Sequence, residues 1–265
     1  MNTLSINHFP PLKYAGVEAV NMLCTNLSFS GENVKKIMLT SCHASEGKTY
    51  LSMNIMRTLA KLGKSVVLVD ADLRRSVVVQ KYGIQFSLGE NAPGLSHFLA
   101  GMAGEADVVF ETNIPGAYMV PVGRKVSNSL SLLNSQRFKK LLDDLSAQFD
   151  YVIIDAPPVG LVIDAAQIAK FCDGTVLVVG FNSVRRQELV DARDQIMQTG
   201  CPILGAVMNM TEYDSYLSKK YSYRSYYSHY GYYSKYGKYG HYGKYDKYTA
   251  DEDSDSKKKS GRRKS

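Results

Sequence analysis

Gly47, Lys48 and Thr49 form the segment best suited to chemistry, because they follow an apolar run and a short polar loop. The run is Lys36–Thr40 (KIMLT) and the loop covers residues 41–46. In a strand, loop and helix of this kind, the loop amides and the helix N-terminus bind phosphate oxygens. The lysine neutralises phosphate charge and the threonine hydroxyl binds Mg²⁺. The segment predicts a P-loop.

Three aspartates follow two further apolar runs. Asp70 and Asp72 follow the apolar run in the block VLVDADLR, and Asp155 ends FDYVIID. A single aspartate at a strand end usually caps a helix or turn. Three of them beside a P-loop instead favour a site in which carboxylates order Mg²⁺ or its water shell, as in a Walker B motif.

Short apolar runs alternate with helical patterns from about residue 34 to 209, as they do in parallel α/β folds. The expected strands are 36–40, 65–70, 118–122, 151–155, 175–179 and 203–208. The expected helices are 16–29, 48–62, 135–148, 163–171 and 185–198. We therefore expect an α/β fold with a doubly wound, mostly parallel sheet and helices on both faces. Its ligands should lie at the carboxyl ends of the strands.

The basic character of the chain is confined to its C-terminal part. The formal net charge is +7, but the cations responsible lie beyond residue 218, which leaves the preceding part nearly neutral. From Tyr230 to Tyr248 a tyrosine recurs at every third residue, among Gly, Lys, His and Ser. Such a segment has almost no aliphatic side chains to bury and is expected to be disordered. We divide the chain into a lead-in with a helix (1–33), a P-loop domain (34–212) and a tyrosine-rich basic tail (213–265).

The cysteines and the apolar runs exclude several classes of protein. The four cysteines contain no CxxC pair, which argues against a zinc site or a disulfide framework and fits a reducing compartment. The first residues lack the apolar stretch of a signal peptide, and no run reaches the roughly 18 apolar residues of a membrane span. Any association with a membrane is expected to come through a partner or the basic tail.

Two blocks are more specific than the P-loop itself: VLVDADLRRS at 67–76 and DYVIIDAPPVGLVIDA at 150–165. With the segment 121–138 and the tyrosine-rich tail, they resemble the bacterial tyrosine kinases of capsular and exopolysaccharide synthesis. That family is a branch of the deviant P-loop ATPases, which also include partition and division-site ATPases. The resemblance runs from about Glu18 to Asn209 and implies a kinase that uses ATP and Mg²⁺.

The resemblance assigns a role to each matching residue. It implies that Lys48 binds phosphate, that Asp70 accepts the proton of the incoming tyrosine hydroxyl, and that Thr49, Asp72 and Asp155 arrange Mg²⁺. The same carry-over makes Arg74 a phosphate or subunit contact and Asn209 a contact for adenine. The residues expected to bind the nucleotide are Ser45, Glu46, Gly47, Lys48, Thr49, Tyr50, Arg74 and Asn209.

The resemblance also implies substrates and partners. The expected phosphate acceptors are Tyr230, Tyr232, Tyr233, Tyr236, Tyr239, Tyr242, Tyr245 and Tyr248. Further copies of the chain, a transmembrane adaptor of the polysaccharide co-polymerase type that activates the kinase, and polysaccharide synthesis proteins as substrates are the expected partners. The expected location is the cytoplasm, at the inner face of the cell membrane through that adaptor.

The chain departs from the family pattern in its first helix and in its P-loop. Asn21 and Cys24 follow Glu18 where the family carries two arginines used in ring assembly, so the ring is not predicted. Ala44 and Ser45 replace Pro-Gly, and Ser45 fits without strain only if its φ angle is negative. A slow turnover is expected from this change. Tyr50 also stands where a small hydroxyl residue is usual.

Three other functions compete with the kinase. A partition or division-site ATPase would carry a signature lysine at the position of His43, so this alternative is disfavoured. A regulator that binds nucleotide without transferring phosphate is compatible with the altered loop. Binding of nucleic acid through lysines and stacking tyrosines of the tail ranks lowest.

Overall fold

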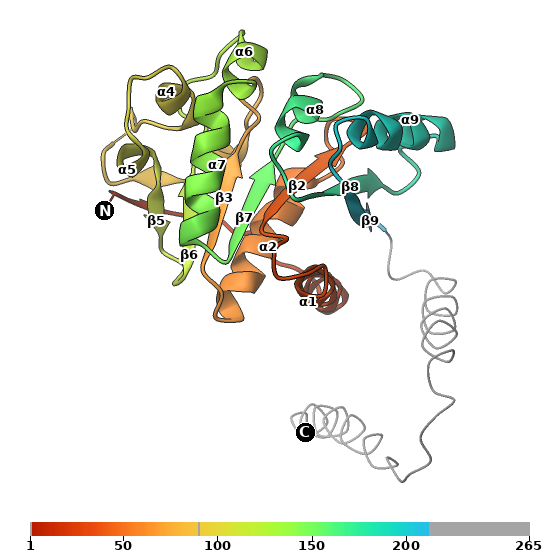
Figure 1. The fold of residues 1–265 in the computed structure, drawn as a ribbon. Helices are drawn as coiled ribbons and strands as arrows, with labels where there is room; N and C mark the ends of the chain where they lie inside the picture. The colour runs from red at the N-terminus through yellow and green to blue at the C-terminus, as the bar shows by residue number, and fades with distance from the viewer. Residues whose placement is uncertain (1, 90, 212–265) are drawn as a thin grey trace, which may run out of the picture. The chain divides into compact units, whose positions relative to one another are not determined.

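The computed structural model describes residues 2–89 and 91–211. The acceptor tyrosines from 230 to 248, and the disorder predicted for the tail, therefore lie outside the described residues. The described part holds a nine-stranded sheet with helices on both faces (Figure 1), which confirms the expected α/β class.

The sheet has the strand order β4-β1-β5-β6-β3-β7-β2-β8-β9. The strands are β1 (Asn2–Ser5), β2 (Lys36–Ser41), β3 (Val66–Asp70), β4 (Gln85–Phe86), β5 (Phe110–Thr112), β6 (Ala117–Val120), β7 (Tyr151–Asp155), β8 (Gly174–Gly180) and β9 (Ile203–Asn209). All six expected strands are present. They form one continuous parallel block from β6 to β9. Within residues 2–89 and 91–211, antiparallel pairing occurs only between β5 and β6 and between β1 and β4.

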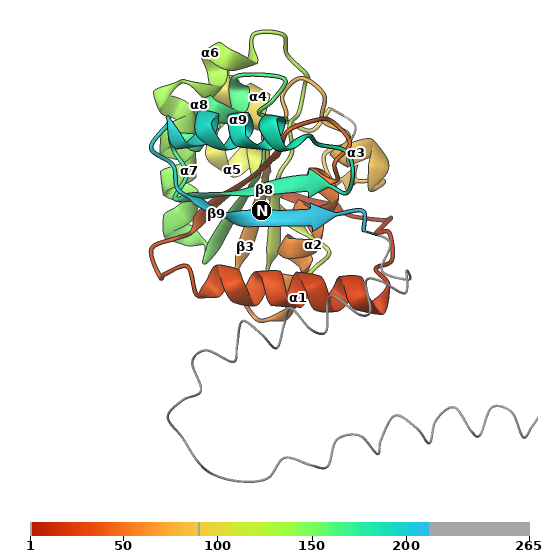
Figure 2. The same cartoon turned by 90° about the vertical axis from the view of Figure 1, so that its right-hand side faces the viewer.

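The helices lie on the two faces of this sheet. They are α1 (Tyr14–Ser28), α2 (Lys48–Lys61), α3 (Val78–Lys81), α4 (Leu95–Leu99), α5 (Glu105–Val108), α6 (Ser129–Leu133), α7 (Gln136–Gln148), α8 (Asp164–Ala169) and α9 (Arg186–Met197). Figure 2 shows α1 and α2 on one face and α7, α8 and α9 on the other. The sheet is thus covered on both faces, which is why its central strands are apolar throughout.

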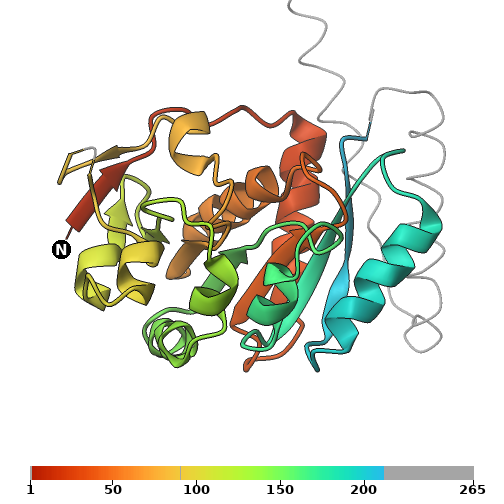
Figure 3. The same ribbon diagram turned by 90° about the horizontal axis from the view of Figure 1, so that it is seen from above.

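Alternate residues of each central strand pack into two separate hydrophobic cores, one on each face of the sheet. In β3, Val66 and Leu68 pack with α1 and α2, whereas Val67 and Val69 pack with α7 and α8. All four are fully buried. The period of two along a strand thus places one set of side chains in each core, and the sheet lies between the two layers when viewed from above (Figure 3).

The sequence did not predict β1, β4 and β5. Residues 2–5, which we expected to be part of a lead-in, form β1 and pair in parallel with β5 and antiparallel with β4. These strands have only two to four residues. Alternation of apolar and polar residues is not visible over so short a length, because the pattern needs at least four to eight residues.

The parallel block brings the chemically suited residues to one edge of the sheet. Asp70 and Asp155 end the neighbouring strands β3 and β7 and are register partners. β2, which leads into the loop before α2, is the next strand beyond β7. The P-loop and the two carboxylates therefore meet at the carboxyl ends of adjacent strands, where open α/β sheets bind their ligands.

Candidate nucleotide and metal site

The loop between β2 and α2 has the left-handed turns of a phosphate-binding loop. Gly47 has φ +87° and Ser45 has φ +64°. Lys48 and Thr49 open α2 directly after Gly47, so the helix N-terminus points its free amides toward the loop. The positive φ of Ser45 is the strained outcome that the sequence left open, and it costs about 1–2 kcal/mol for a residue with a side chain.

Glu46 braces the loop with its carboxylate and does not line the cavity beside it. Its Oε2 accepts the His43 N–H at 2.7 Å, and its Oε1 accepts the Gly180 N–H at 2.9 Å. The Ser183 hydroxyl lies 2.9 Å from the same Oε1. The side chain is 2% exposed, and the loop is thereby tied to the end of β8. The carboxylate of Glu46 is thus engaged inside the protein, and the expected contact of this residue with the nucleotide stays a prediction.

Asn209 holds the loop from the other side. Its amide Nδ2 donates to the carbonyl oxygen of Glu46 at 2.9 Å. A Cβ added to Gly47 would come within 2.0 Å of the same nitrogen, so the close approach requires glycine. Asn209 also lines the cavity, and its contact with adenine stays a prediction.

Asp70 and Asp155 form a buried pair of carboxylates below the loop. Burial, followed by the charge of Asp155, raises the pKa of Asp70 well above its usual range. Burial also raises the pKa of Asp155 to about 6, although the hydroxyls of Thr49 and Ser52 and the charge of Lys48 oppose the rise. Burial of two like charges disfavours the ionised forms of both carboxyl groups, and a nearby cation would stabilise those ionised forms.

Only one oxygen of Asp70 has a partner among the described residues. Its Oδ2 accepts a hydrogen bond from the Ser76 hydroxyl, whereas its Oδ1 is buried without a hydrogen-bond partner. A buried acceptor left without a donor costs about 1–3 kcal/mol. This oxygen therefore marks a place where a proton, a water or a metal ion would be stabilised.

Asp72 and Arg74 take part in the turn after β3. The Asp72 carboxylate accepts the Arg75 N–H at 2.9 Å, as an aspartate at a turn commonly does. Arg74 Nε donates to Asp164 at 2.8 Å, and Ser129 donates to the same carboxylate at 2.5 Å. The guanidinium of Arg74 thus has an ion pair within the chain. Its expected contact with a phosphate or another subunit stays a prediction.

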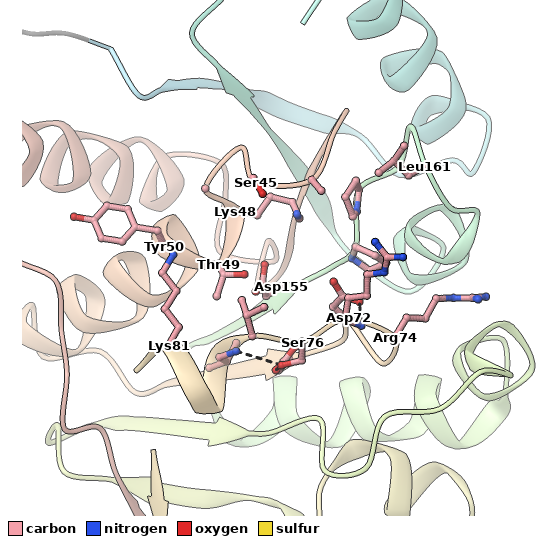
Figure 4. Close-up of a pocket in the computed structure, with 18 of the residues that line it drawn as sticks. Ser45, Lys48, Thr49, Tyr50, Asp72, Arg74, Ser76, Lys81, Asp155 and Leu161 are labelled. Carbon is pink, nitrogen blue, oxygen red and sulfur yellow. Dashed lines mark hydrogen bonds between the residues drawn. The ribbon is translucent and has the colours of Figure 1, made fainter. Parts of the chain in front are cut away.

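These groups surround one cavity of about 890 Å³ (Figure 4). Its wall includes Lys48, Thr49, Asp70, Asp72 and Asp155. The wall also includes the predicted nucleotide contacts Ser45, Gly47, Tyr50, Arg74 and Asn209. The volume lies near the top of the range of small-molecule sites, which leaves room for a nucleotide and part of a second reactant.

The sequence missed several polar residues of the site. Arg75, Ser76 and Lys81 line the cavity, and Asp164 holds Arg74 from α8. Ser76 ends the block VLVDADLRRS and Asp164 lies near the end of the block at 150–165. A polar residue inside these blocks was the available signal, but its partner could be found only from the packing of α3 and α8 on the sheet.

Magnesium is the metal that this set of donors fits. No group of three or more His, Cys, Asp and Glu side chains that could hold a metal ion occurs within residues 2–89 and 91–211. Mg²⁺ commonly binds through one or two carboxylates, a hydroxyl, waters and the phosphates of a substrate. Asp72, Asp155 and Thr49, which all line the cavity, provide this kind of oxygen ligand.

The sequence was compared with known families and proteins. The family described as an AAA domain matches residues 34–181. The chain is 39% identical over 192 residues to the tyrosine-protein kinase CpsD of Streptococcus pneumoniae serotype 4, strain ATCC BAA-334 / TIGR4. That alignment covers 72% of this chain and 83% of the relative.

The fold was compared with solved structures. The kinase domain of the Escherichia coli tyrosine kinase ETK matches with a TM-score of 0.68 and 31% identity, over 73% of this chain and 75% of that one. The septum site-determining protein MinD from Pyrococcus horikoshii OT3, complexed with Mg-ADP, matches with a TM-score of 0.56 and 23% identity. This second match covers 67% of this chain and 72% of that one. At such low identity it shows a shared fold alone.

Proposed function

Since the chain belongs to the bacterial tyrosine-protein kinases that carry an AAA domain, we propose that it phosphorylates its own tail. The reaction transfers the terminal phosphoryl group of Mg-ATP to tyrosine hydroxyls among residues 230–248. The observation that carries the proposal is the convergence of Lys48, Asp70 and Asp155 on one cavity beside a P-loop. Phosphoryl transfer needs positioning and charge neutralisation more than covalent catalysis.

The P-loop and the start of α2 bind the triphosphate. The loop amides and the helix N-terminus provide donors for phosphate oxygens, and Lys48 neutralises their charge. Bound Mg²⁺ supplies further neutralisation of the phosphates. Thr49, Asp72 and Asp155 hold this ion, directly or through its waters.

Asp70 accepts the proton of the acceptor tyrosine. A phenol has a pKa near 10, far above that of an ordinary carboxylate, so an ordinary aspartate is a weak base toward it. The raised pKa of Asp70 narrows this gap, and its partnerless Oδ1 is free to receive a proton. Both features support the role of proton acceptor.

The chain regulates the synthesis and export of a capsular or exopolysaccharide together with a membrane partner. Each phosphate adds nearly two negative charges to a basic tail, so multiple phosphorylation reverses the sign of the tail and changes its association with partners. No helix in residues 2–89 and 91–211 has the length and apolar character needed to cross a membrane. A transmembrane adaptor with an activating cytoplasmic segment would bring the kinase to the inner face of the membrane.

The test is autophosphorylation of the full chain. Wild type and Lys48→Met are incubated with Mg-ATP, with and without the cytoplasmic segment of a candidate adaptor, and phosphates on residues 213–248 are counted by mass spectrometry. Phosphotyrosine in the wild type and its loss in Lys48→Met are expected. Nucleotide binding without any phosphotyrosine under both conditions would contradict the proposal.

A further inference from the structure

Two cations on the wall of the cavity have no role in the reaction proposed above. Arg75 and Lys81 both line the cavity and are exposed. Across residues 2–89 and 91–211, neither side chain has an ion pair or a hydrogen bond. Arg74 differs from them, because it is held by Asp164 at 2.8 Å. We call the two side chains of Arg75 and Lys81 the cationic rim.

The backbone that carries the cationic rim is fixed at several points. The Arg75 N–H donates to the Asp72 carboxylate at 2.9 Å. Leu73 and Val78 are each 1% exposed and pack into the two cores. The rim therefore has a defined position beside the carboxylates, while the charged ends of its side chains are free for a ligand.

The chain segment 75–81, which carries the rim, crosses the cavity on the far side of the carboxylates from the P-loop. In Figure 4, Ser45 and Lys48 lie on one side of Thr49 and Asp155, and Ser76 and Lys81 lie on the other. The attacking and leaving oxygens of a phosphoryl transfer lie roughly in line. If the P-loop holds the nucleotide, as the proposed function requires, the tyrosine approaches from the side of the rim.

We propose that the cationic rim selects acceptor tyrosines by the negative charge of the residues that flank them. This inference rests on the proposed function. Two exposed cations attract acidic neighbours of the acceptor and repel basic ones, and salt screens both effects. The partner is an acidic tyrosine segment, supplied by the tail of this chain or of a second copy.

Among the expected acceptors from Tyr230 to Tyr248, such a segment occurs at one end only. Tyr245 precedes Asp246, and Tyr248 precedes the acidic run 251–255. The residues between Tyr230 and Tyr242 contain no acidic side chain. Among the acceptors from Tyr230 to Tyr248, phosphorylation therefore begins at Tyr245 and Tyr248.

Each phosphate then prepares the next acceptor. The tyrosines from 230 to 248 recur every third residue, so a phosphotyrosine places nearly two negative charges three residues beyond the preceding tyrosine. The rim attracts this new charge as it attracts the acidic run. Phosphates consequently accumulate from Tyr248 toward Tyr230.

The test compares two peptides as substrates of the full-length protein. One has residues 243–255, and the other has the same sequence with every Asp and Glu changed to Asn and Gln. We expect the wild type to prefer the acidic peptide by about three- to tenfold in kcat/KM, the range of one or two exposed ion pairs. The variant Arg75→Gln/Lys81→Gln should bring this ratio close to one. The control variant Lys61→Gln/Arg186→Gln removes two exposed cations outside the cavity and should keep the wild-type ratio.

The outcomes separate this inference from the function on which it rests. Phosphotyrosine on both peptides with the same ratio in wild type and rim variant would overturn the selection by charge alone. A rim variant that raises only the KM for ATP would overturn it too, because the cations would then bind the nucleotide. No phosphotyrosine on any peptide or on the tail would overturn the acceptor chemistry, and the selection with it. Time-resolved mass spectrometry of the wild-type tail should show Tyr245 and Tyr248 modified first, and simultaneous modification of all tyrosines would contradict the order.

Discussion

Replacement of Glu46 by glutamine should destabilise the protein before any nucleotide binds. The Glu46 carboxylate accepts the N–H groups of His43 and Gly180, one on each oxygen. A glutamine amide has one oxygen and one NH₂ group, and the NH₂ group cannot accept. One of the two N–H donors would then face another donor inside a buried site.

The magnitude follows from the loss of one charged hydrogen bond. Hydrogen bonds to charged groups contribute about 1.5–3 kcal/mol, and an orphaned buried donor costs a similar amount. We expect the free energy of unfolding to fall by about 2 kcal/mol. For a domain of this size, that loss lowers Tm by about 4–8 °C.

Thermal unfolding followed by near-UV circular dichroism, without nucleotide, measures this effect. The matched control is Glu111→Gln, an exposed position on β5, where we expect a change within about 0.5 kcal/mol. ATP affinity is measured in parallel. An unchanged Tm combined with weakened ATP binding would contradict a structural role for the Glu46 carboxylate and would instead indicate that it binds the nucleotide.

Three further substitutions test other parts of the site. Gly47→Ala should lower Tm and ATP affinity more than Gly63→Ala. Both glycines have positive φ, but a Cβ at Gly47 would lie 2.0 Å from Asn209, whereas a Cβ at Gly63 would have no neighbour within 4 Å. Equal effects of the two substitutions on Tm would contradict the role of the contact with Asn209. Asp155→Asn should abolish phosphotransfer. The same variant should raise the free energy of unfolding by about 2–3 kcal/mol at pH 7.5 without nucleotide or metal. The reason is that the pKa of Asp155 lies near 6 in the folded protein and near 3.8 in the unfolded chain. Between pH 6 and pH 4 the Asp155 carboxyl is protonated in the folded wild type but ionised in the unfolded chain, so the stability of the wild type rises as the pH falls. The stability advantage of the variant should therefore vanish near pH 4. Urea titrations at several pH values measure the free energy of unfolding of both proteins. Arg74→Met leaves the Asp164 side chain, which is 1% exposed, without its cation. The free energy of unfolding should fall by about 2 kcal/mol, less than for a fully buried ion pair because Arg74 is 38% exposed. In the same titration, the double variant Arg74→Met/Asp164→Leu should recover part of this loss.

Long buried strands were the predictable part of the fold. β2, β3, β7 and β8 are runs of five to seven residues, apolar over most of their length, and such runs indicate a strand covered on both faces. The strands β1, β4 and β5 were missed because pairing with neighbours, and not their own sequence, makes them strands. The short helices α3 to α6 have four or five residues each, too few for a helical period to appear.

The site was predictable as far as motifs mark the ends of strands. Lys48, Thr49, Asp70, Asp72 and Asp155 were expected together, and all five line one cavity. The directions of side chains were not predictable, since they depend on partners far along the chain. Glu46 accepts a hydrogen bond from Gly180, and Arg74 donates one to Asp164. Both pairs lie far apart in the sequence, so no local sequence pattern predicts them.

The two buried carboxylates of the site, Asp70 and Asp155, also link metal binding to cellular acidity. Burial raises the pKa of Asp155 to about 6 and also raises the pKa of Asp70, so both carboxyl groups take up protons that a bound cation must displace. Uptake of Mg-ATP should therefore release protons into the buffer, and its calorimetric heat should change with the ionisation enthalpy of the buffer used. A fall in cytoplasmic pH would then weaken Mg-ATP binding directly, so the kinase would respond to the acid–base state of the cell as well as to its nucleotide supply.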